Sequence, residues 1–298
     1  MLHKIRTMVL CLVAVAGAAA GQTPAAKAQA TPPSELTVDD TFDPAIPDPA
    51  FAPGKGPAVF FDERHRNVVT LATYFRPVGQ FLGKDGYVVK PSREVFTQAV
   101  LKPARVLVIA NARAPEGAPE FSSALTAIEV RAVESWVKKG GGLLLIADRA
   151  PFGGPARALA HALGVWLDDN TILRRGDDGK PDGVLTIDVK ADGNAAHPVF
   201  ARVSRVVYVV GESVSGPGIV LKAPAGTYSG PTNQATEGPS AAGKPLILAF
   251  SHGKGRVVVI GDAGIASAFG SVGGSSHRGI SEADNARFLR NVLRWLSK

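Results

Sequence analysis

The sequence is almost without cysteine, because Cys11 is the only one in 298 residues. Cys11 lies in an N-terminal segment that we expect to be removed, so the mature protein would contain neither a disulfide nor a thiol nucleophile. An oxidising compartment would not harm such a chain. Its core must therefore be stable without cross-links.

The N-terminus also lacks an apolar run long enough for a comfortable membrane span. MLHKIR is a short cationic start, and the apolar run TMVLCLVAVAGAAA follows it. Two Ala-x-Ala cleavage candidates are Ala18-Ala19-Ala20 and Ala28-Gln29-Ala30. This layout predicts a secretory signal peptide over residues 1–30 and a periplasmic or secreted protein, with an uncleaved anchor as the alternative. Leu10 precedes Cys11 where a lipid-attachment signal would have a small residue, so we expect no lipid anchor.

A strong excess of charge of one sign is missing as well. Removal of Lys4, Arg6 and Lys27 with the signal lowers the net charge from +7 to +4. The remaining basic residues are scattered and form no run interleaved with aromatic residues. A nucleic-acid partner is therefore not indicated, and the oligomeric state is left open.

A familiar catalytic motif is missing too, because there is no G-x-S-x-G elbow. DRAPFGGPA, residues 148–156, is a glycine-containing turn into a helix, and such helix starts bind anions through free amides. It is not a P-loop, because the Lys-Ser/Thr pair is absent. Asp148 itself would disfavour a phosphate there.

What the sequence does contain is an alternation of short apolar runs and helical stretches after a proline-rich arm at 31–56. From residue 57 to residue 298 this alternation predicts one α/β domain with a largely parallel sheet and helices on both faces. We expect strands at 58–61, 87–89, 105–111, 143–148, 184–189, 205–210, 246–251 and 256–261. We expect helices at 70–83, from 126 onward, at 155–164 and at about 281–297. Residues 168–182 and 223–244 are expected to be loops, and 252–255 to be a hairpin turn.

The helix after Thr126 carries the clearest local pattern. Thr126-Ala127-Ile128-Glu129 predicts a capping box, in which the Thr hydroxyl and the Glu carboxylate satisfy amides of the first turn. The spacing of apolar residues predicts its buried stripe, which consists of Ile128, Ala132, Val133, Trp136 and Val137.

Polar residues follow most of the expected parallel strands. Ligands of open α/β sheets bind at the carboxyl ends of the strands, so these residues predict the walls of a polar crevice. They are Asp62, Glu63, His65 and Asn67 after the first strand, Asn111 after the third, Asp148 and Arg149 after the fourth, Glu212 after 205–210, and Asp262 after the last. For each residue alone, starting a turn or capping a helix is the competing interpretation.

Two chemistries fit the group that begins with Asp62. A carboxylate beside an imidazole can orient it as a general base, which would make Asp62, Glu63, His65 and Asp148 catalytic. Alternatively, Asp62 and His65, with Asp148 or Asp262, could hold a divalent metal. The other polar residues at the strand ends would then contact the ligand.

A series of segments, in this order and spacing, resembles the DUF4350-type bacterial proteins over most of residues 42–298. The segments are FDPAIPDPAFAPGKGP, FDERHRN, YFRPVGQFLGKDGYVV, VLVIANA, ESWVKKGGGLLLIADRAPFGG, LAFSHGKGRVVVIGDAG and DNARFLRNVLRWL. That family resembles the class I glutamine-amidotransferase-like (GATase1-like) superfamily, as do GldG and ThuA-type domains. The resemblance implies a flavodoxin-like three-layer α/β/α sandwich with a mostly parallel sheet and a C-terminal antiparallel hairpin.

The resemblance does not imply glutamine hydrolysis, because Asp148-Arg149-Ala150 stands where that chemistry needs a cysteine. The family pattern, D-E-A-H-x-N-x-H and A-D-H, would place further histidines at Val69 and Arg149, which weakens the metalloenzyme hypothesis. Arg149 would instead neutralise Asp148 or bind an anion. Two functions remain: a hydrolase acting on a small polar or carbohydrate substrate, or a non-catalytic ligand- or protein-binding domain.

Overall fold

A seven-stranded sheet forms the centre of the structure, a computed structural model that describes residues 36–271 and 277–298. Its strands are β2 (Ala58–Asp62), β3 (Val88–Ser92), β4 (Val106–Ala110), β5 (Gly142–Ile146), β12 (Ile219–Lys222), β14 (Pro245–His252) and β15 (Gly255–Ile260). Their order is β12-β14-β15-β5-β4-β2-β3. The five strands from β15 to β3 are parallel, whereas β14 and β12 are antiparallel to their neighbours. The expected α/β fold with a C-terminal hairpin is confirmed.

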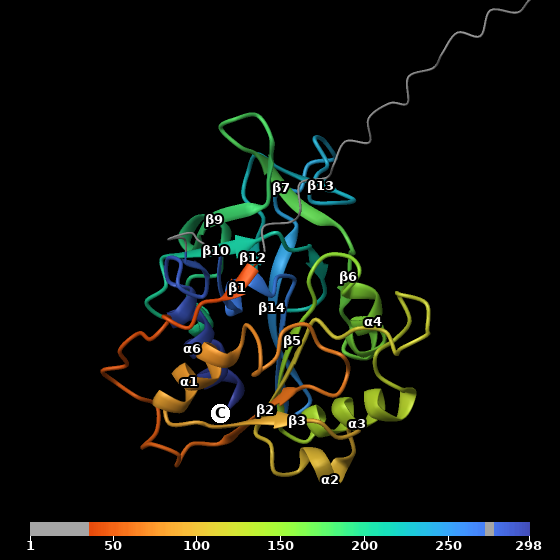
Figure 1. The fold of residues 1–298 in the computed structure, drawn as a ribbon, viewed down its shortest axis with the longest axis vertical. Coiled ribbons are helices and arrows are strands. Elements are labelled where there is room, and N and C mark those ends of the chain that lie inside the picture. The colour runs from red at the N-terminus through yellow and green to blue at the C-terminus, as the bar shows by residue number, and fades with distance from the viewer. Residues whose placement is uncertain (1–35, 272–276) are drawn as a thin grey trace, which may run out of the picture. The chain divides into compact units, whose positions relative to one another are not determined.

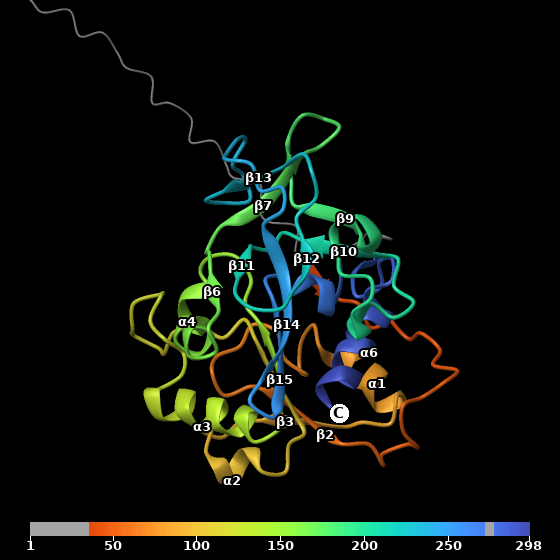
Figure 2. The ribbon, with the colours of Figure 1, turned by 180° about the vertical axis from the view of Figure 1, so that it is seen from behind.

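Helices cover both faces of this sheet, as Figures 1 and 2 show. One face carries α1 (Arg76–Lys84) and α6 (Asn285–Leu296), and the other carries α2 (Gln98–Leu101), α3 (Ala127–Lys138) and α4 (Gly153–Ala162). Alternate residues of a strand point to opposite faces. Accordingly, Leu144 packs in one core cluster with Phe288 of α6, and Leu145 packs in the other with Trp136 of α3.

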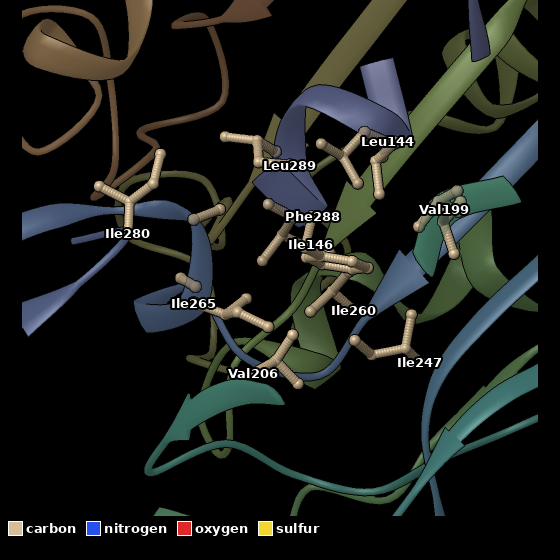
Figure 3. Close-up of a cluster of buried hydrophobic side chains, with 14 of the residues drawn as sticks. Leu144, Ile146, Val199, Val206, Ile247, Ile260, Ile265, Ile280, Phe288 and Leu289 are labelled. Atoms are coloured by element: carbon tan, nitrogen blue, oxygen red, sulfur yellow. The ribbon is translucent and has the colours of Figure 1, made fainter. Parts of the chain in front are cut away.

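The core on the α6 side is drawn in Figure 3, where Leu144, Ile146 and Ile260 of the sheet face Phe288 and Leu289. All five side chains are at most 2% exposed. β5 and β15 are apolar on both faces, and every second residue of each strand points into this layer.

The capping box of α3 forms as expected, but the buried stripe is shifted. The Thr126 hydroxyl accepts a hydrogen bond from the Glu129 amide, and the Glu129 carboxylate accepts one from the Thr126 amide. Ile128 is 67% exposed, so its predicted burial is wrong, and Glu129 is buried instead at 3%. The helix turns Glu129 inward because its carboxylate is engaged on the core side.

Two strands that the sequence placed in the parallel sheet lie outside it. β9 (Val184–Asp188) and β10 (Arg205–Val209) pair antiparallel with each other in a two-stranded sheet. The periodicity of a β-rich run identifies a strand but not its partner, which explains the error.

The predicted loops also contain strands. β7 (Thr171–Arg175), β8 (Pro181–Asp182) and β13 (Thr227–Gly230) form a three-stranded sheet. The remaining short elements are β6 (Trp166–Leu167), β11 (Val214–Ser215), β16 (Ala268–Ser271), β17 (His277–Gly279), α5 (Val189–Asp192) and the 3₁₀ turns η1 (Pro198–Phe200) and η2 (Gly264–Ala266).

The described part of the proline-rich arm is held against the domain. It begins with β1 (Leu36–Val38), which pairs with β16. Further along, the Phe42 ring lies 5.6 Å from that of Phe81, and the Ala50 amide donates to Asp85 at 2.7 Å. The expected signal peptide, residues 1–30, lies outside the described residues. Among the described residues no helix is long and apolar enough to cross a membrane.

A matched pair of isoleucine variants tests this core. Ile260→Ala removes a fully buried side chain from the layer in Figure 3, and we expect a loss of about 2–5 kcal/mol in the free energy of unfolding. Ile128→Ala removes an exposed one, and we expect a change within about 0.5 kcal/mol. Urea denaturation measures both. A large loss for Ile128→Ala would contradict the helix orientation described above.

Candidate functional site

His65 is held between two carboxylates at the carboxyl end of β2. Nδ1 of His65 lies 2.9 Å from both carboxylate oxygens of Asp62, and Nε2 lies 3.0 Å from Oε1 of Glu129. All three side chains are buried. A ring nitrogen without hydrogen would direct its lone pair at an anionic oxygen, so both nitrogens carry hydrogen and the ring is an imidazolium. We call Asp62, His65 and Glu129 the clamp.

The electrostatics of the clamp agree with its geometry. Burial lowers the pKa of His65, but the hydrogen bonds and charges of Asp62 and Glu129 outweigh burial, so the pKa is raised above its usual value. Burial raises the pKa of Glu129, but hydrogen bonds from Thr126, Phe96 and His65 outweigh it, and that pKa is lowered. Both shifts therefore favour a protonated His65 and an ionised Glu129.

The sequence singled out Glu129 as part of the capping box but not as a residue of the site. Glu129 lies 64 positions after His65. Its role in the capping box was sufficient to explain a glutamate at this position. The available signal was the phase of α3, since a helix that buries Val133, Trp136 and Val137 also turns position 129 inward.

The other polar residues of the first motif hold its loop in place. The Asn67 amide nitrogen donates to Asp62 at 3.1 Å and to the Ala110 carbonyl at 3.0 Å. Glu63 turns away from His65, since its carboxylate accepts from the Leu71 amide and from Arg93. Asp62, His65 and Asn67 are thus brought together, whereas Glu63 serves a different contact.

Asn111 and Asp148 meet at the ends of β4 and β5. The Asp148 amide donates to Oδ1 of Asn111 at 3.0 Å. Arg149 approaches Asp148 to 3.5 Å and also donates to the Val210 carbonyl at 3.3 Å. Among the described residues, no hydrogen bond or ion pair joins Asp148 to the clamp, so the predicted set divides into two groups.

The second group is a buried acidic cluster of Asp148, Asp262 and Glu212. Ile146 and Ile260 are register partners, so β5 and β15 end side by side and deliver Asp148 and Asp262 to one place. Glu212 comes from a segment outside the sheet. Its amide donates to the Gly261 carbonyl at 2.7 Å, which holds it at this sheet edge. The Asp262 carboxylate caps η2, where it accepts from the Gly264 amide at 2.6 Å.

Burial dominates the protonation of this cluster. It raises the pKa of Asp148 to about 6, against the lowering effect of Arg149. Burial and the charge of Asp148 raise the pKa of Asp262 well above its usual range, and burial with the charges of Asp169 and Asp148 does the same for Glu212. Burial therefore favours the protonated forms of all three acids, although Asp148 ionises above about pH 6.

A cavity of about 260 Å³ lies among the loops that follow β2, β4 and β5. Two of its lining residues are the cations Arg66 and Arg113, and its remaining wall includes Phe152 and the acid Glu120. Arg66 donates one hydrogen bond, to the Ala114 carbonyl at 2.8 Å, and the Arg113 guanidinium lies 5.9 Å from the centre of the Phe152 ring. We call this cavity the arginine crevice.

The crevice residues were missed by sequence reasoning, although the predicted place was close. Arg66 stands inside the DERHRN motif, and Arg113 follows Asn111 by two positions. The two arginines are the signal that could have been used, because they follow neighbouring parallel strands.

The clamp is not arranged as a metal site. Among residues 36–271 and 277–298, no group of three or more His, Cys, Asp or Glu side chains is placed to hold a metal ion. His65 in particular has no ring nitrogen left for a metal, because both already donate to carboxylates.

Comparison with known proteins agrees with the fold. No protein-family model and no curated protein matches the chain. A solved structure described as the mmIFT52 N-terminal domain is 17% identical, with a TM-score of 0.60, over 80% of this chain and 97% of that one. A ThuA-like protein from Bacteroides uniformis is 14% identical over 85% and 94%, with a TM-score of 0.47. A cytoplasmic protein from Salmonella typhimurium is 13% identical over 82% and 100%, also at 0.47.

The likeness to the mmIFT52 N-terminal domain is one of fold alone.

The buried acidic cluster predicts a stabilising substitution. The folded-state pKa of Asp148, about 6, exceeds its unfolded value of about 3.9. Ionisation of Asp148 therefore lowers the free energy of unfolding above about pH 6 and has no effect on it below about pH 4. Asp148→Asn keeps an oxygen acceptor and removes the charge. We expect a gain of about 1–3 kcal/mol in the free energy of unfolding at pH 8, and none near pH 4.

Urea denaturation across this pH range measures the effect, with the exposed Asp177→Asn as control. A gain that is equal at pH 4 and pH 8 would mean that ionisation of Asp148 is not its cause.

Proposed function

We propose that this domain binds a small anion in the arginine crevice and acts as a ligand-binding module rather than a hydrolase. The observation that carries the proposal is the placement of Arg66 and Arg113, from loops after two neighbouring strands, in one cavity at the carboxyl edge of the sheet. This edge is where open α/β sheets bind their ligands.

The bonding capacity of the two arginines supports the proposal. A guanidinium has five N–H donors. Among the described residues the Arg66 guanidinium donates one hydrogen bond, and the Arg113 guanidinium donates none and lies near the Phe152 ring. The unused donors suit the fork geometry of a carboxylate or phosphate oxygen pair.

The size and the lining of the crevice limit the kinds of ligand that could bind. A volume of about 260 Å³ is at the small end of ligand cavities. Glu120 adds one carboxylate to the lining, and a carboxylate accepts hydrogen bonds from hydroxyl groups. A small hydroxylated anion, such as a sugar acid or a sugar phosphate, matches both features.

Two features weigh against catalysis by the residues expected from the sequence. A general base needs a free nitrogen, and both ring nitrogens of His65 are hydrogen-bonded to carboxylates. Asp148, another expected catalytic residue, belongs to the separate acidic cluster with Asp262. We therefore infer that Asp62 and His65 shape the crevice and do not react.

We further propose that the protein is exported and is a relative of the DUF4350-type proteins. Support for export is the signal-peptide pattern of residues 1–30. Support for the family is the order of the sequence segments that resemble it.

Arginine variants test the binding proposal. We expect sulfate and glucuronate to raise the melting temperature of the mature protein, because a ligand that binds only the folded state stabilises it. Arg113→Gln and Arg66→Gln should each weaken binding about tenfold or more, since a hydrogen bond to a charged group contributes about 1.5–3 kcal/mol. Titration calorimetry gives the dissociation constants.

Arg64→Gln is the matched control. Arg64 lies in the same loop, is exposed and does not line the crevice, so its loss should leave binding unchanged. Equal weakening in all three variants would point to the net charge of the loop and would overturn the assignment of the crevice.

The export proposal is tested with the full chain in a bacterial host that has a periplasm. We expect the periplasmic fraction to contain a protein whose intact mass corresponds to a chain that begins at Gly21 or Thr31. Leu12→Arg, which breaks the apolar run, should leave the unprocessed chain in the cytoplasm. Cytoplasmic retention of the unaltered chain with its first residues intact would overturn export.

A further inference from the structure

The clamp and the arginine crevice share a stretch of backbone. Arg66 directly follows His65 and has a φ of +52°, a left-handed conformation that is uncommon for a residue with a side chain. The Arg113 amide donates to the His65 carbonyl at 2.9 Å. Arg66 in turn donates to the carbonyl of Ala114, the neighbour of Arg113. A shift of His65 would therefore move both arginines.

The clamp also joins the elements from which the crevice is built. Asp62 belongs to β2, and Asn67 connects the Asp62 carboxylate to the Ala110 carbonyl at the end of β4. Glu129 belongs to the first turn of α3, which follows the loop that carries Arg113. Among the described residues, His65 is the single side chain that bonds to both carboxylates.

The charge of His65 is what makes this arrangement stable. The ionisable groups that face it are Asp62 from its own strand end and Glu129 from α3. The centre of the Phe96 ring lies 5.0 Å from that of the His65 ring, and the Phe96 amide donates a hydrogen bond to Glu129. Among the described residues no other cation hydrogen-bonds or pairs with either carboxylate. Loss of the proton would leave two buried anions without a counter-charge, which is strongly destabilising.

We propose that His65 is the positioning residue of the arginine crevice, and that its positive charge holds Arg66 and Arg113 where an anion can bind. This inference rests on the proposed function, because it concerns the control of the same site. Anion binding should then depend on pH through a group that does not touch the anion. The imidazolium is lost as pH rises, so binding should weaken toward alkaline pH.

Sulfate is the probe, because it keeps its double charge throughout the range from pH 6 to pH 9.5. We expect its dissociation constant for the mature protein to rise about tenfold or more across this range, while the arginines stay charged. NMR titration should show the guanidinium Cζ signals of Arg66 and Arg113, as well as their backbone amides, shifting with the midpoint of the His65 ring. A merely structural histidine would shift the two neighbouring amides but would change neither the dissociation constant nor the Cζ signals with that midpoint.

Glu129→Gln moves the midpoint. Glutamine at this position keeps a capping box but removes one of the two charges that raise the pKa of His65. The midpoint for the ring, for both amides and for sulfate binding should therefore shift together to lower pH. Glu134→Gln is the control, because Glu134 lies on the same helix and pairs with Lys138 rather than with the clamp.

The outcomes separate the two proposals. Sulfate binding that does not change with pH, with arginine Cζ signals that ignore the His65 midpoint, overturns the positioning role and leaves the binding function standing. Absence of sulfate binding at every pH, with Cζ signals that follow His65, supports the positioning of the arginines and overturns the binding function. Absence of both overturns both. The wild-type titration decides these cases even where Glu129→Gln fails to fold.

Discussion

An imidazolium buried between two carboxylates is the interaction on which this edge of the molecule depends. Three ionised groups have left water, and desolvation of this kind is offset only when every charged atom finds a partner. Asp62 accepts from His65, Asn67 and the Arg64 amide, and Glu129 accepts from His65, Thr126 and the Phe96 amide. Because the partners come from β2 and from α3, satisfying the charges also fixes the position of the helix relative to the sheet.

The same sheet edge contains a second buried group that is balanced in the opposite way. Around Asp148, Asp262 and Glu212 the acids outnumber the cations, with Arg149 as the cation that pairs with Asp148. The raised pKa values of Asp262 and Glu212 indicate that protons take the place of the missing cations there. The edge thus has one part where a cation lies between two carboxylates, and another part where buried acids favour their protonated forms.

The sequence predicted the central strands well because their apolar character on both faces has one structural explanation. It also placed Asp62 beside His65, because the two residues are only three positions apart at one strand end. Glu129 could not be found in this way, because its contact spans 64 positions. Ile128 was misplaced because apolar spacing gave the helix a phase that the inward Glu129 overrides. Strands 184–189 and 205–210 were misassigned because pairing partners leave no trace in a strand's own residues.

The arginines show why a site is found by accounting for hydrogen bonds rather than by reactivity. In the DERHRN motif the residues with the most suggestive chemistry, Asp62 and His65, have every ring nitrogen or carboxylate engaged within the protein. Arg66 keeps most of its donors. Spare donors alone do not mark a site, because exposed Arg64 has them too. A cavity at the strand ends is the second requirement, and Arg66 meets both conditions because the clamp holds its backbone in place.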